Sequence, residues 1–168
     1  MERILVSACL LGEPVRYDGR AKPVQHEVLA QWRKEGRVVA ACPECLGGLP
    51  TPRPAAEIAR GATAADVLDG HAAVRTAAGA DVSEAFVAGA QATLDLARAH
   101  GCRLALLQER SPSCGSRERY DGSFEGRTTV DAGVTTALLR ANGIEVFGPD
   151  RLEALAARLA VLEGSLSD

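Results

Sequence analysis

Short apolar runs alternate with segments of helical periodicity along most of the chain. The apolar runs, which predict buried strands, are residues 4–8, 38–41, 103–107 and 144–147. Between and after them, apolar residues recur every three or four positions, which predicts amphipathic helices over residues 24–35, 83–100, 132–141 and 151–163. Strands that alternate with helices in this way are typical of a mainly parallel sheet whose strands are joined by crossover helices.

The middle of the chain carries weaker patterns. Residues 66–70 and 73–76 are short apolar runs beside turn residues, and they predict a small β-hairpin insertion. Residues 42–54 contain four prolines and two glycines, which predict a shaped loop without a regular element. The expected fold class is therefore α/β: a three-layer Rossmann-like sandwich with a mainly parallel sheet and a small β-hairpin insertion. At 168 residues and 46% hydrophobic content, we expect a single domain over residues 1–168.

Charge and hydropathy exclude several classes of partner. The net charge of −3 is spread along the chain, so there is no general attraction to a nucleic acid polymer. No apolar run approaches the roughly 18 residues that span a bilayer, so we expect no membrane association. The first residues lack the features of a secretory signal, which predicts a cytoplasmic protein. Thiols stay reduced in that compartment, so the five cysteines are expected to be metal ligands or reactive thiols rather than disulfides.

Three of the cysteines lie at or beyond the carboxyl ends of predicted strands. They are Cys9, Cys42 and Cys114. The carboxyl ends of parallel strands line the crevice where α/β proteins bind ligands, so these thiols could meet in one pocket and form a metal site. Cys102 lies at the opposite end of its strand and is expected to be a small buried packing residue.

Cys42-Pro43-Glu44-Cys45 is a C-x-x-C motif with three interpretations: a thioredoxin-like dithiol, half of a zinc site, or part of an iron–sulfur site. The dithiol interpretation requires a helix that starts at the first cysteine, which the nearby glycines and prolines argue against. A closed zinc site needs four ligands, and the three strand-end cysteines with Cys45 could supply them. The residues alone leave these alternatives open.

Candidate catalytic groups lie beside two of these cysteines. Glu44 stands two residues after Cys42 in a proline-restricted segment, where a carboxylate could serve as a general acid or base. Ser111 and Ser113 precede Cys114, and their hydroxyls could bind a ligand or satisfy loop backbone groups. None of the three histidines is near these serines in the sequence, which disfavours a Ser-His-Asp hydrolase.

Several multi-residue blocks, taken together and in order, resemble the bacterial domain-of-unknown-function family 523, which includes the iron–sulfur-dependent thiouracil desulfidases. The blocks are residues 4–12, 16–19, 42–44, 46–53, 111–116 and 120–122. The resemblance runs from residue 4 to about residue 147, which is nearly the whole chain.

The resemblance implies a 4Fe-4S cluster held by Cys9, Cys42 and Cys114, with one iron left open for a substrate sulfur. Cys45 is then a local substitution rather than a fourth ligand. Glu44 would handle protons, and Ser111 would position substrate or water. The implied enzyme is a desulfidase-like hydrolase or lyase acting on a C–S bond. It would convert a 2-thiouracil-like heterocycle to the oxo compound without redox change, and the open iron would take up the sulfur.

The implied substrate is a small thiolated pyrimidine or a related thioamide, and a sulfur-accepting protein is a further candidate partner. Two alternatives come from other classes of function. One is a non-catalytic iron–sulfur or zinc module that acts as a sulfur carrier. The other is a zinc-dependent hydrolase in which Glu44 moves protons from a metal-bound water.

Overall fold

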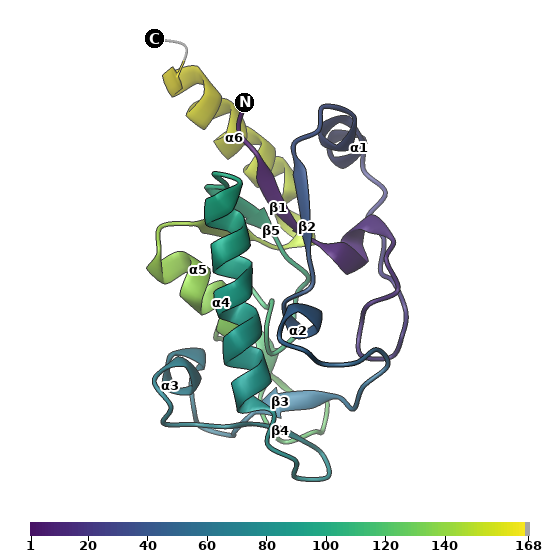
Figure 1. The fold of residues 1–168 in the computed structure, drawn as a ribbon, viewed down its shortest axis with the longest axis vertical. Helices are drawn as coiled ribbons and strands as arrows, with labels where there is room; N and C mark the ends of the chain where they lie inside the picture. The colour runs from purple at the N-terminus through teal and green to yellow at the C-terminus, as the bar shows by residue number, and fades with distance from the viewer. Residues whose placement is uncertain (167–168) are drawn as a thin grey trace.

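A four-stranded parallel sheet forms the centre of the computed structural model, which describes residues 1–166 (Figure 1). Its strands pair in the order β2-β1-β5-β8, and every pairing is parallel. The strands are β1 (Ile4–Ser7), β2 (Val38–Ala41), β5 (Leu104–Leu106) and β8 (Glu145–Phe147). The predicted mainly parallel sheet is confirmed, and its four strands lie within the predicted ranges.

Helices cover both faces of the sheet, as the alternation of side chains along β1 requires. Ile4 and Val6 belong to the buried cluster formed with α1 and α6, whereas Leu5 belongs to the cluster formed with α4 and α5. The four helices are α1 (Glu27–Lys34), α4 (Ser83–Ala99), α5 (Val134–Ala141) and α6 (Leu152–Leu166). The three-layer prediction is confirmed. None of the helices within residues 1–166 is long and apolar enough to cross a membrane.

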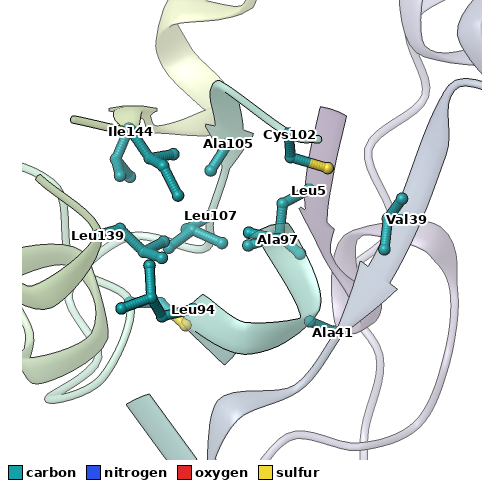
Figure 2. Close-up of a cluster of buried hydrophobic side chains, with 12 residues drawn as sticks. Leu5, Val39, Ala41, Leu94, Ala97, Cys102, Ala105, Leu107, Leu139 and Ile144 are labelled. Atoms are coloured by element: carbon teal, nitrogen blue, oxygen red, sulfur yellow. The ribbon is translucent and has the colours of Figure 1, made fainter. Parts of the chain in front are cut away.

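Cys102 lies in the buried cluster between the sheet and α4, as predicted for a packing residue. Figure 2 shows it close to Leu5 and Ala97 in this cluster, which also contains Leu94 and Leu107. Its side chain is 5% exposed, and burial raises the pKa of its thiol from 9.0 to about 11.

This burial predicts a pH-dependent contribution of Cys102 to stability. The contribution is fully present below pH 9 and is lost as the pH rises through about 11, because the unfolded chain releases the proton first. Relative to Cys102→Ala, the wild-type free energy of unfolding should fall by up to about 2 kcal/mol across this range. Urea unfolding of both proteins measures the difference, and a difference independent of pH would contradict it.

A smaller antiparallel unit lies beside the amino-terminal end of α4 (Figure 1). It pairs β3 (Ala56–Ile58) with β4 (Val74–Thr76), and α3 (Ala64–Leu68) lies between them in the chain. A β-hairpin-like insertion is therefore present, but the predicted pairing of residues 66–70 with 73–76 is wrong. Thr63 and Asp66 form a capping box, which starts a helix at this point. The backbone N–H of Thr63 donates to Asp66 Oδ2 at 2.9 Å, and the backbone N–H of Asp66 donates to Thr63 Oγ1 at 3.1 Å.

The segment predicted to be an irregular loop begins with a one-turn helix, α2 (Pro43–Leu46), so this prediction is also wrong at its start. Proline is compatible with the first position of a helix because no N–H is needed there. The helix packs closely on α4: a Cβ on Gly47 would lie 2.0 Å from the Ala85 carbonyl oxygen, and one on Gly89 would lie 2.0 Å from that of Pro43. Backbone contact therefore holds α2 against α4.

Candidate active site

A cavity lies at the carboxyl end of the sheet, where the strand order reverses. The chain passes from β1 to β2 on one side and then to β5 on the other side of β1. Ligands of open α/β sheets bind at such a switch point. The cavity contains about 410 Å³ of space free of protein atoms, including the part open to solvent. All five predicted site residues line it: Cys9, Cys42, Glu44, Ser111 and Cys114.

The three cysteines reach this cavity from three separate segments. Cys9 lies in a single 3-10 turn, η1 (Ala8–Leu11), directly after β1. Cys42 is the N-cap of α2, directly after β2, and Cys114 lies in the loop that follows β5. Both Cys9 and Cys114 are buried, and all three thiols are free. Because the carboxyl ends of parallel strands lie at one edge of the sheet, residues far apart in the chain come to share one cavity.

The three thiols are also electrostatic neighbours. Burial raises the pKa of Cys9 to about 11 and the pKa values of Cys42 and Cys114 to about 12. A neighbouring thiolate contributes to each of these rises: Cys42 acts on Cys9, Cys114 acts on Cys42, and Cys9 acts on Cys114. Without a metal the thiols therefore stay protonated at neutral pH. Metal binding would have to displace their protons.

The spacing of the ligands matters for the kind of metal they could hold. Within residues 1–166, no group of three or more His, Cys, Asp or Glu side chains is placed to hold a single metal ion. A closed zinc site would need four ligands, with thiolate sulfurs at about 2.3 Å from one ion. A polynuclear cluster can be held by three thiolates that line one cavity, because its iron atoms at different corners each take one thiolate.

Two arginines supply positive charge beside these thiols. Arg16 opposes the rise in the pKa of Cys9 and therefore favours its thiolate. Burial lowers the pKa of Arg53, but Glu44 and the thiolates of Cys42 and Cys45 outweigh this effect and raise it. Both arginines line the cavity, so they can offset the charge of bound thiolates. This electrostatic setting fits an iron–sulfur cluster.

Both carboxylate oxygens of Glu44 have partners. Arg53, which is 8% exposed, donates from Nε to Oε1 at 3.1 Å. Ser113 donates from Oγ to Oε2 at 2.9 Å. These charge-assisted hydrogen bonds orient the carboxylate at the cavity wall. The sequence pointed to Glu44, but neither partner could be assigned from spacing alone.

Ser111 lies at the cavity wall with its oxygen already engaged. Its Oγ accepts the backbone N–H of Cys114 at 2.8 Å and lies 3.3 Å from Ser113 Oγ. Because the oxygen serves as acceptor there, the hydroxyl hydrogen remains available to a ligand or to Ser113. The loop itself packs on the start of α5, where Val134 and Thr135 donate their N–H groups to its carbonyl oxygens at 2.7 and 2.9 Å. Ser111 is therefore held in place.

Sequence reasoning missed two further polar residues at the cavity. Ser7 Oγ accepts the backbone N–H of Gln108 at 2.9 Å and lies 3.8 Å from the Cys114 sulfur, to which it donates. Gln108 is buried and lines the cavity with Tyr17. Ser7 ends β1 and Gln108 comes shortly after β5, so the strand-end position that singled out the cysteines could also have identified these two residues.

Comparisons with known proteins agree with this geometry. The family model described as 2-thiouracil desulfurase matches residues 4–151. The chain is 44% identical over 152 residues to a protein of Bacillus subtilis (strain 168) named Uncharacterized protein YbbK, covering 89% of this chain and 97% of that protein. It also matches a solved structure named as the 4Fe-4S-dependent thiouracil desulfidase TudS. That match has a TM-score of 0.87 and 49% identity, over 96% of this chain and 99% of the other.

Proposed function

The chain belongs to the 2-thiouracil desulfurase family, and on that premise we propose that it is a 4Fe-4S-dependent desulfidase acting on a 2-thiouracil-like heterocycle. The observation that carries the proposal is the single cavity at the switch point, lined by Cys9, Cys42, Cys114, Glu44 and Ser111. The TudS structure, whose name states both the cluster and the activity, supports it at 49% identity.

Cys9, Cys42 and Cys114 would hold the cluster through their thiolates. Bound in this way, the cluster would supply an iron with an open position, a Lewis acid suited to the soft sulfur of a thiocarbonyl. Arg16 and Arg53 would offset the negative charge of the thiolates.

The net reaction is hydrolytic: a thiocarbonyl and water give a carbonyl and hydrosulfide, with no net transfer of electrons. Glu44 would take the proton from the attacking water, since a carboxylate with one hydrogen bond on each oxygen retains free lone pairs. Arg53 and Ser113 would keep this carboxylate oriented. Ser111 would donate its hydroxyl hydrogen to the substrate or to the water, because its oxygen already accepts the Cys114 N–H.

The proposal is tested by preparing the protein with iron and sulfide in the absence of oxygen and incubating it with 2-thiouracil. We expect iron–sulfur absorbance, together with equal amounts of uracil and hydrosulfide. Stoichiometric zinc in protein prepared with iron available, with no hydrosulfide released, would overturn the proposal in favour of a zinc protein. Iron–sulfur absorbance without any turnover would instead indicate a non-catalytic sulfur carrier.

A further inference from the structure

Cys45 has no role in the proposed reaction, yet its sulfur lies against that of a proposed cluster ligand. Cys42 is the N-cap of α2 and Cys45 is the third residue of the helix. Both sulfurs donate toward the Val15 carbonyl oxygen, at 3.8 and 3.9 Å, and the two side chains also interact directly. Helix geometry places Cα atoms three residues apart at about 5 Å, within the range of about 4.4–6.8 Å that a disulfide bridges.

Cys45 is also accessible to an oxidant. Both Cys45 and Cys42 are half-buried, whereas Cys9 and Cys114 are 8% and 6% exposed. Arg53 lies beside it, with Nη1 at 3.9 Å from its sulfur. Partial exposure and a cationic neighbour are the features that distinguish reactive cysteines from buried structural ones.

We propose that Cys42 and Cys45 form a reversible disulfide whenever Cys42 is not bound to iron, and that this bond protects Cys42 from irreversible oxidation. A peroxide would oxidise the Cys45 thiol to a sulfenic acid and release one water. The Cys42 sulfur would then attack the Cys45 sulfenic sulfur and form the S–S bond. The hydroxide of the sulfenic acid would leave and combine with the Cys42 proton to give a second water. A small thiol such as glutathione would restore both cysteines by exchange.

The disulfide itself requires only the contact between the two sulfurs. Its protective effect on a cluster ligand rests on the proposed function. The two parts are therefore tested by different measurements, one on the covalent bond and one on iron.

Peptide mapping tests the bond. Full-length protein is treated with hydrogen peroxide, its remaining thiols are alkylated, and it is digested with trypsin under non-reducing conditions. Trypsin leaves Cys42 and Cys45 together in the peptide of residues 38–60, and places Cys9, Cys102 and Cys114 in peptides 4–16, 99–103 and 111–117. We expect peptide 38–60 to be unalkylated and to lack two hydrogen atoms. Peptide 38–60 cross-linked to another peptide, or alkylated at both cysteines, would overturn the proposal.

Cluster recovery tests the protection. Wild-type protein, Cys45→Ser, Cys45→Ala and the control Cys102→Ala are oxidised with peroxide, reduced with a thiol, and supplied with iron and sulfide without oxygen. We expect the wild type and the control to regain most of their iron. Both Cys45 variants should regain several-fold less iron, because a sulfenic acid formed on Cys42 then has no disulfide partner and is oxidised further to sulfinic acid. Equal recovery in all four proteins would refute the protective role. Failure of every untreated protein to bind iron would refute the proposed function, whereas the peptide map still decides the disulfide.

Discussion

Cys114→Ser protein, supplied with iron and sulfide in the absence of oxygen, is expected to bind at least about tenfold less iron–sulfur cluster than the wild type. Serine is close to cysteine in size and keeps a hydrogen-bonding group beside Ser7 and Ser113. Its hard hydroxyl, however, is a poor replacement for a soft thiolate at iron. Iron content and visible absorbance measure the loss, and desulfidation of 2-thiouracil should fall with them.

The control for this experiment is Cys102→Ala, which removes a thiol from the same buried cluster but at a distance from the cavity. It should bind iron as the wild type does. Circular dichroism at increasing temperature shows whether each variant is folded, since Cys114 is itself part of the core. If folded Cys114→Ser protein keeps its cluster and its activity, the assignment of this cysteine as a ligand is wrong.

Glu44→Gln is expected to lower kcat by about 10²–10⁴-fold while the iron–sulfur absorbance stays unchanged. The amide has the shape of the carboxylate, and its carbonyl oxygen can still accept from Arg53 or Ser113. It cannot take a proton from water, so only the chemical step should suffer. Initial rates of hydrosulfide release at saturating 2-thiouracil measure the effect.

Glu13→Gln provides a matched control, because Glu13 is an exposed glutamate that does not line the cavity. Its kcat should remain within about twofold of the wild type. Wild-type turnover by Glu44→Gln protein with a full complement of iron would show that another group handles the proton.

The convergence of the three cysteines could be predicted because it follows from a general property of parallel sheets. The strands that precede Cys9, Cys42 and Cys114 are short buried apolar runs, and such runs indicate strands whose carboxyl ends share one edge. The sequence pattern therefore placed these residues without any knowledge of side-chain conformation. The choice of Cys42 over Cys45 as a ligand came from the resemblance, and it stays a prediction.

The errors fall where local signals compete. Pro43 and the following glycines indicated a loop, but a proline at the first helical position and a glycine just after the last are both compatible with a short helix. In the middle of the chain, the spacing of Thr63 and Asp66 was a capping signal that the hairpin interpretation passed over. The strand β3 has only three residues and too little apolar patterning to be recognised.

The fine structure of the site could not be predicted, because it depends on contacts between distant segments. Ser113 is 69 residues from Glu44, and their hydrogen bond exists only because the loop after β5 folds back toward α2. Arg53 is only nine residues from Glu44, but the segment between them contains prolines, and the sequence does not specify the path of its backbone. Pairings of this kind need the three-dimensional structure.

The backbone contact of Gly47 with α4 means that some of the residues lining the cavity can change more freely in evolution than others. A side chain at Gly47 or Gly89 would meet carbonyl oxygens, so neither glycine can gain one unless α2 and α4 move apart. Val15 and Tyr17 lie in a loop outside both helices, and both line the cavity. We therefore expect substrate preference to diversify among relatives through this loop, while the wall that carries Glu44 stays the same.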